Sequence, residues 1–147
     1  MTEPVGDYAG LVTRAIAFAI DAAIINLAAA TVAVVIGLGM SVLNVPDVVV
    51  AAAVAAGGVA YVLWTVAYFT TFWSTTGQTP GSRVMGIQVV CAQGDERVSL
   101  RRAVTRLAGM VLAAIPFFAG FLLIAVDDRR RGLQDRLART LVLYGPP

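Results

Sequence analysis

The stretch VTRAIAFAIDAAIINLAAATVAVVIGLGM, Val12–Met40, decides the fold class of this chain. Beyond Arg14 near its start, the only charged residue in it is Asp21. A helix rises about 1.5 Å per residue, so a run of this length can cross a hydrocarbon core of about 30 Å. The preceding segment contains Glu3 and Asp7, and the run is longer than the apolar core of a signal peptide. We therefore expect a transmembrane helix that stays in the mature protein.

A second apolar stretch, Val48–Trp73, contains no charged residue. The short connection Ser41–Asp47 separates it from the first, so the two runs should form an antiparallel helical hairpin. The second run ends in a cluster of rings that is typical of the headgroup level of a membrane, Tyr68, Phe69, Phe72 and Trp73. Small residues also recur every four positions, which favours close helix packing in lipid, as at Ala15, Ala19 and Ala23 and at Ala52, Ala56 and Ala60.

The overall composition agrees with a membrane protein. Of the 147 residues, 59% are hydrophobic and 14% are charged, whereas a soluble domain of this size has about 25% charged residues. The chain has no His and one Cys, Cys91, so we expect no disulfide framework, no metal site, no cofactor and no enzymatic activity. Ten of the eleven Arg residues lie between Arg83 and Arg139, flanking apolar runs without interleaved aromatic platforms. This pattern argues against nucleic-acid binding.

Between the second and third apolar runs, the sequence has features of β-structure. Val84–Val90 is rich in β-branched residues, and the turn signal Gly94-Asp95 follows it. We expect a surface β-hairpin over about residues 83–100, with Val98–Leu100 as its second strand. Thr140–Tyr144 is a further strand candidate, and residue 142 should then lie close enough to residue 88 to cross-link.

The third apolar run has an ambiguous path. Ser99 can cap a helix that begins at Leu100, and Pro116 interrupts the run Leu107–Val126. A straight helix would cross the bilayer once, whereas a helix broken at Pro116 could enter and leave on the same side. Five Arg residues lie in Ser74–Arg106 and five after Val126, so the positive-inside rule favours the broken hairpin and a cytoplasmic N-terminus.

These observations predict an all-α integral membrane protein that forms one domain over residues 1–147. It is a small helical bundle of two full spans, about 12–40 and 48–73, and a Pro-broken third span or hairpin at about 100–126. A small cytoplasmic β-hairpin completes the predicted fold.

Asp21 is the most informative residue for function. A carboxylate in the middle of a membrane helix costs about 2.5–3.5 kcal/mol on insertion scales and needs a partner. Arg14 lies seven residues earlier, so the two side chains share a face but lie about 10 Å apart along the axis. A partner from another segment is therefore at least as good a hypothesis. Asp21 is interpreted either as an ion or proton site or as a buried polar group that holds the bundle together.

The segment DDRRRGLQDRLART, Asp127–Thr140, is the second polar constellation. Asp135 lies four residues after Arg131 and four before Arg139, which predicts a solvated helix with surface ion pairs. Anionic lipid headgroups should also attract three consecutive Arg residues, at about 1 kcal/mol per charge. These lipid-headgroup candidates are Arg129, Arg130 and Arg131.

Three ordered blocks of the chain resemble the RDD family of bacterial membrane proteins. They are AGLVTRAIAFAIDAAI, TTGQTPGSRVMGIQVV and RRGLQDRLARTLVL. The resemblance places the family's arginine on Arg14 and its two aspartates on Asp21 and Asp135. Two departures are the absence of Lys after the Thr-Pro-Gly turn and Arg139 where Gly is usual. The resemblance implies a bacterial plasma membrane protein for which transport of an ion or other ligand has been proposed.

Two functions are compatible with the sequence. The first is transport of an ion or small solute by a homo-oligomer, with Arg14 and Asp21 in its polar core. The second is an accessory or structural subunit of a larger envelope or transport complex, whose arginine-rich face contacts lipids or a partner. In both, membrane lipids are partners, and no metal or other cofactor is expected.

Overall fold

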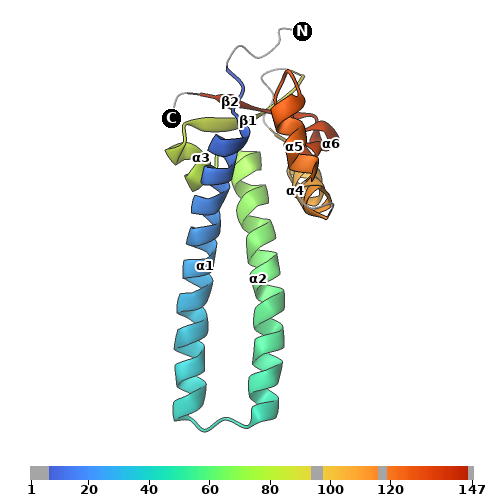
Figure 1. Cartoon of the computed structure of the whole chain (residues 1–147). Helices are drawn as coiled ribbons and strands as arrows, with labels where there is room; N and C mark the ends of the chain where they lie inside the picture. Colours follow the sequence, from blue (N-terminus) through green and yellow to red (C-terminus); the bar gives the residue numbers. More distant parts are fainter. Residues whose placement is uncertain (1–6, 94–97, 116–118, 146–147) are drawn as a thin grey trace.

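A long helical hairpin dominates the computed structural model, which describes residues 7–93, 98–115 and 119–145 (Figure 1). Helix α1 comprises Leu11–Val42, and the antiparallel helix α2 comprises Asp47–Thr75. Both helices are long and apolar enough to cross a membrane. The turn between them contains Asn44, whose φ of 50° is a left-handed conformation that Asn tolerates well. The two predicted spans and their hairpin connection are confirmed.

The chain after α2 folds at one end of this hairpin, where α1 begins (Figure 1). The elements there, in chain order, are α3 (Pro80–Val84), β1 (Ile87–Cys91), α4 (Leu100–Ala114), α5 (Ala119–Val126), α6 (Leu133–Ala138) and β2 (Thr140–Tyr144). The arginine-free turn lies at the opposite end of the hairpin. The described parts of both arginine-rich segments therefore lie at the same end of the helical hairpin.

The small sheet joins the middle of the chain to its end. Strands β1 and β2 pair antiparallel, from Ile87 opposite Tyr144 to Cys91 opposite Thr140. The prediction of a strand at Thr140–Tyr144 is confirmed. The predicted hairpin with Val98–Leu100 is wrong, because Ser99 Oγ accepts a hydrogen bond from the backbone N–H of Arg102 and the chain enters α4 at Leu100. The predicted hairpin turn at residues 94–97 lies outside the described residues.

The start and the register of β1 also differ from the prediction. Val84 belongs to α3, because Thr79 caps that helix and Pro80 occupies its first position, where proline is well accommodated. In the sheet, Gln88 lies opposite Leu143 and Val89 lies opposite Val142. Residues 88 and 142, which were expected to lie close enough to cross-link, are therefore one position out of register, and their side chains lie on opposite faces of the sheet.

Helices α4 and α5 occupy the predicted third apolar segment. Each is too short to cross a bilayer alone, and their directions differ by 105° across a break that includes residues 116–118, which are not described. The predicted break at Pro116 lies in that gap. By length and composition the pair fits either a broken span or a re-entrant hairpin. The two helices pack closely at Gly120, where a Cβ atom would lie 2.6 Å from the Cβ of Ala113.

The core lies where the sheet, α4 and the adjoining ends of α1 and α2 meet. Phe69 stacks on Phe18 of α1 with ring centroids 5.7 Å apart, and it also contacts Trp73 at 5.2 Å. Phe69 and Trp73 are each 3% exposed, and Tyr68 is 9% exposed. The predicted aromatic belt is therefore largely turned into the protein, because these rings belong to one core cluster with residues of the sheet and α4.

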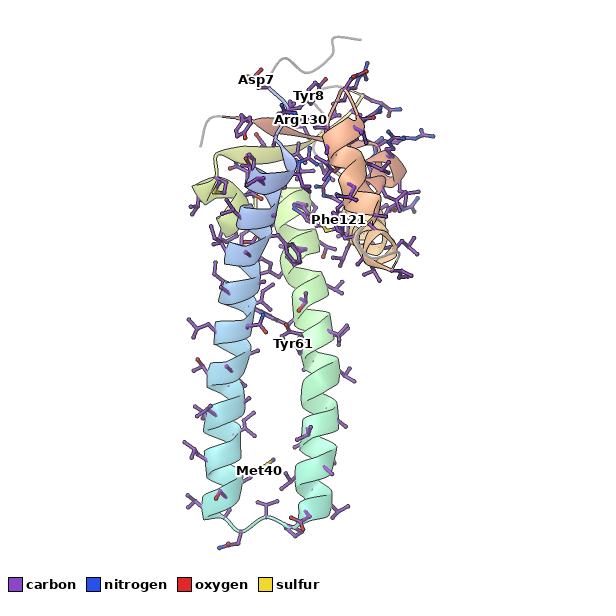
Figure 2. The ribbon with its side chains drawn as sticks, in the orientation of Figure 1. Asp7, Tyr8, Met40, Tyr61, Phe121 and Arg130 are labelled. Atoms are coloured by element: carbon purple, nitrogen blue, oxygen red, sulfur yellow. The ribbon has the colours of Figure 1, made fainter. Side chains whose placement is uncertain are left out.

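The rest of the hairpin has few internal contacts. Buried residues in α1 end at Ile25, and those in α2 begin at Tyr68. Halfway along, Tyr61 donates a hydrogen bond to Asn26 Oδ1 at 3.1 Å, and Figure 2 shows Tyr61 between the two helices. The predicted small-residue stripes, at residues 15, 19 and 23 and at 52, 56 and 60, are exposed along the hairpin. They do not form a packing face within this chain.

Candidate functional site

The first candidate cluster contains one carboxylate and two arginines from three distant segments. Asp135 in α6 is fully buried and receives a hydrogen bond from Arg14 Nη1 of α1 at 2.6 Å. Its other oxygen is paired with Arg106 Nη1 of α4, and the same nitrogen donates to Thr140 Oγ1 at 2.9 Å. Arg106 is itself 3% exposed and stacks over Trp73, 5.1 Å from the ring centroid. The cluster ties α1, α4, α6 and β2 together.

Local structure positions Asp135 for this role. Its Oδ2 accepts a hydrogen bond from the backbone N–H of Gly132 at 3.0 Å, which fixes the first turn of α6. Gly132 N–H and the two guanidinium groups share the two carboxylate oxygens. The prediction of surface ion pairs from Asp135 to Arg131 and Arg139 is wrong. Arg131 pairs with Asp127, and Arg139 ends α6 in a left-handed conformation, so neither lies on the buried face of that helix.

The second candidate cluster surrounds Asp21, which is 2% exposed on α1. Its Oδ1 accepts hydrogen bonds from Tyr68 Oη at 2.9 Å and from the backbone N–H of Gly81 at 2.8 Å. Its Oδ2 accepts one from Thr79 Oγ1 at 2.5 Å. The expectation that Asp21 finds its partner in another segment is confirmed. Arg14 is bound to Asp135, so the alternative, a direct pair of Arg14 with Asp21, does not form.

The loop before β1 builds this second cluster. Thr79 Oγ1 accepts from the backbone N–H of Ser82, and α3 docks on α1. The close approach requires glycine at position 81, because a Cβ atom there would lie 2.1 Å from the backbone oxygen of Ala17. The Thr-Pro-Gly turn therefore presents one hydroxyl and one amide to Asp21, and both donors are uncharged.

Both clusters border one cavity of about 630 Å³ between the two long helices and the α4–α5 pair. Arg14, Asp21 and Arg106 are its charged lining residues. Most of the remaining wall is apolar, and four aromatic rings contribute to it, those of Phe18, Phe69, Trp73 and Phe121. A volume in this range is typical of small-molecule sites. Among the described residues, no group of His, Cys, Asp or Glu side chains is arranged to hold a metal ion.

The run of three arginines has partners within the chain. Arg131 donates to Asp127 through Nε at 3.0 Å, and Arg136 donates to the same carboxylate at 2.7 Å. These hydrogen bonds, that of Arg131 first, hold the pKa of Asp127 well below its ordinary value. Arg130 Nη1 donates to the carbonyl of Tyr8 at 3.0 Å, and Figure 2 labels both residues near the start of α1. Contact of Arg129, Arg130 and Arg131 with lipid headgroups stays a prediction.

Comparison with known proteins adds the family to this geometry. The model of the RDD family matches residues 8–139, which include Arg14, Asp21 and Asp135. The chain belongs to the RDD family. It is also 38% identical over 66 residues to the uncharacterized protein YxaI of Bacillus subtilis (strain 168), a match that covers 45% of this chain and 42% of YxaI. The chain thus matches less than half the length of that relative. No solved structure matches it.

The three residues of the RDD resemblance divide between the two clusters, Arg14 and Asp135 in one and Asp21 in the other. Arg106 contributed to the sequence-based predictions only through the arginine count that sets topology, so its role here was missed, as were the donors to Asp21. The block TTGQTPGSR contained the signal for Thr79 and Gly81, since a Thr-Pro-Gly turn can aim a hydroxyl and an amide in one direction. Nothing in the sequence pointed to Tyr68 as more than a lipid-facing ring.

Proposed function

We propose that this RDD protein transports an ion or small solute as a homo-oligomer, with Asp21 as the group that exchanges a proton or a cation. The observation that supports this is the set of donors to Asp21 among the described residues: two hydroxyl groups and one backbone N–H, with no arginine among them. A carboxylate paired with arginine is already neutralised. One that faces only uncharged donors at the wall of a cavity keeps its charge available to a proton or a small cation.

The role of Arg14 changes in this proposal. Arg14 was expected to share a polar core with Asp21, but its guanidinium is bound to Asp135, to the carbonyl of Ala9 and to the carbonyl of Arg130. It therefore stabilises the arrangement of α1 against α6. Asp21 alone serves as the exchanging group, and the cluster around Asp135 holds the helices that line the cavity in place.

Homo-oligomerisation supplies the rest of the path. Two helices of the described chain are long enough to span a membrane on their own, and they do not enclose a pathway. Gly57 and Gly58 of α2 have open space beside them, since a Cβ atom at either position would meet nothing within 4 Å. Small residues on an uncovered membrane helix allow a second helix to approach closely.

The test is flux in proteoliposomes that contain a pH-sensitive dye. Imposed gradients of Na⁺ or K⁺ should change the internal pH when the wild-type protein is present. Asp21→Asn should fold, because its amide oxygen can still accept hydrogen bonds from Tyr68 and Gly81. Its NH₂ group can donate to Thr79 Oγ1, since the hydroxyl proton of Thr79 can instead point to Ser82 Oγ. The flux should be lost, because an amide neither exchanges a proton nor neutralises a cation.

Asp128→Asn is the matched control, because Asp128 is an exposed carboxylate outside both clusters. It should leave the flux unchanged. Full flux in Asp21→Asn would contradict the proposal, as would the absence of cation-dependent pH change in the wild type. The mass of the purified protein in mild detergent should correspond to more than one copy of the chain.

A second candidate is an accessory or structural subunit of a larger envelope or transport complex. The observation that favours it is that the part of the hairpin between Ile25 of α1 and Tyr68 of α2 has no residue buried within the chain. A foreign helix could pack there as well as another copy could. The same mass measurement separates the two cases, because a stoichiometric foreign subunit would support the accessory role.

A further inference from the structure

The cavity has an apolar wall that is open at its rim. Residues of α4 and α5 form one side of it together with Phe18 and Phe69 of the hairpin. Some lining residues are exposed, with Phe18 at 50%, Val111 at 62% and Leu122 at 60%. Phe121 lines the same wall from α5, where Figure 2 labels it. Because α1 and α2 are apolar membrane helices, this rim opens toward the region that acyl chains occupy.

Two residues that line the cavity have polar side-chain atoms without partners among the described residues. Both hydrogen bonds of Arg106 within the described chain leave from Nη1, while its Nε is buried and donates to no acceptor. The side-chain oxygen of Gln134, a residue only 1% exposed, is buried and accepts from no donor in the described part of the chain. Both residues line the cavity. One unused donor on a cation and one unused acceptor therefore belong to the polar part of the same cavity lining.

The charge of the two arginines in this lining favours an anion. Arg14 and Arg106 share the single carboxylate of Asp135, so these three groups carry one net positive charge. Asp21 belongs to the same lining but lies seven residues beyond Arg14 along α1, about 10 Å by helical rise. A buried guanidinium gains most from an acidic oxygen, which accepts a charge-assisted hydrogen bond.

We propose that this cavity binds an anionic phospholipid. The phosphate accepts a hydrogen bond from Arg106, a hydroxyl of the headgroup donates to the side-chain oxygen of Gln134, and one acyl chain lies along the wall formed by Phe18, Phe69, Phe121 and Leu122. This site differs from headgroup attraction to Arg129, Arg130 and Arg131, because it is internal and has room for a chain. It does not depend on Asp21 exchanging protons or cations.

The experiment titrates the purified full-length protein in mild detergent with lipids and counts the bound molecules by native mass spectrometry. Phosphatidylglycerol should bind once per chain and more tightly than phosphatidylcholine with the same acyl chains, which lacks the net negative charge and the headgroup hydroxyl. Glycerol phosphate, which has the headgroup chemistry without the chains, should bind much more weakly than phosphatidylglycerol. Equal binding of the two phospholipids would overturn the proposal, and tight binding of glycerol phosphate would indicate a free-anion site instead.

Two variants on α5 locate the bound lipid. Leu122→Trp narrows the rim of the cavity, whereas Val126→Trp places the same ring on an exposed residue of the same helix that does not line the cavity. We expect Leu122→Trp to weaken phosphatidylglycerol binding by about tenfold or more and Val126→Trp to leave it unchanged. Equal affinity in both variants would show that the lipid binds elsewhere.

A third variant tests the polar end without removing the buried arginine, whose loss would also disturb Asp135. Gln134→Met keeps an unbranched side chain of similar length but has no amide oxygen. It should reduce the preference for phosphatidylglycerol over phosphatidylcholine while the protein elutes as the wild type does in size-exclusion chromatography. An unchanged preference in the folded variant would contradict the assigned contact with the headgroup.

Discussion

Asp135 and Asp21 are both buried carboxylates, yet their neighbours give them different properties. Asp135 faces two guanidinium groups and one backbone N–H, so its negative charge is already compensated. Among the described residues, Asp21 receives hydrogen bonds only from uncharged groups, those of Tyr68, Thr79 and Gly81. Replacing the carboxylate by an amide should therefore destabilise the fold at Asp135 but not at Asp21.

Asp135→Asn should destabilise the protein strongly. The substitution leaves the guanidinium groups of Arg14 and Arg106 close together without their shared carboxylate, and breaking a buried ion pair in this way costs about 3–5 kcal/mol. Thermal unfolding in detergent measures the loss. Asp128→Asn, at an exposed carboxylate, should change stability by no more than about 0.5 kcal/mol. Equal melting temperatures for the two variants would show that the cluster contributes little.

The stability that Asp127 contributes should depend on pH. The hydrogen bonds of Arg131 and Arg136 hold the pKa of Asp127 below its ordinary value of 3.8, so the unfolded chain binds more protons than the folded one in acid. The stabilisation from Asp127 should be complete above about pH 5 and decrease as the pH falls below its ordinary pKa. The difference in melting temperature between the wild type and Asp127→Asn should therefore shrink from pH 6 to pH 3. A difference that is constant over this range would contradict the assignment.

At the scale of elements, short segments dock on the long helices through close backbone contacts. Helix α3 reaches α1 because residue 81 is glycine, and α4 approaches α6 at Gly109, where a Cβ atom would lie 2.8 Å from the Cα of Gln134. The two-stranded sheet connects these elements. The backbone N–H of Ala9 donates a hydrogen bond to the carbonyl of Val142 in β2 at 2.9 Å. An isolated pair of strands is marginal in water, so this sheet depends on the core beneath it.

The sheet register can be tested by cross-linking. In a Cys91→Ser background, Val89→Cys combined with Val142→Cys places two cysteines directly opposite each other, and a mild oxidant should join them. Gln88→Cys combined with Val142→Cys is the control, because those positions are one residue out of register and face opposite sides. Mobility on a non-reducing gel reports the result. Preferential cross-linking of the control pair would mean that the strands are shifted by one residue.

At the scale of the whole molecule, the protein has a packed end and an open hairpin. The core, both polar clusters, the cavity and the described arginine-rich segments lie where α1 begins and α2 ends, and the Ser41–Asp47 turn lies at the far end (Figure 1). The far part of the hairpin buries no residues in this chain, so it depends on lipid or on other helices. From the distribution of arginine we predict that the packed end faces the cytoplasm.

Labelling of cells with a membrane-impermeant thiol reagent tests this orientation. In a Cys91→Ser background, Asn44→Cys should react from outside, and Tyr144→Cys should react only after the membrane is opened. Both residues are exposed, so burial does not explain a difference between them. Labelling of Tyr144→Cys from outside intact cells would contradict the cytoplasmic packed end and would favour a single crossing by the third apolar segment.

The sequence by itself determined the helical hairpin, the strand at the chain's end and the family. Long uncharged runs can satisfy their backbone groups in lipid only as helices, and the RDD blocks are local patterns. Tertiary structure alone decided the partners of the charges. Arg14 and Asp135 are 121 residues apart, and Arg106 and Tyr68 became part of the clusters only when α4 and α2 were brought beside them. Helical spacing predicts which residues share a face, but the pairing of a buried charge depends on which face of another segment is packed against it.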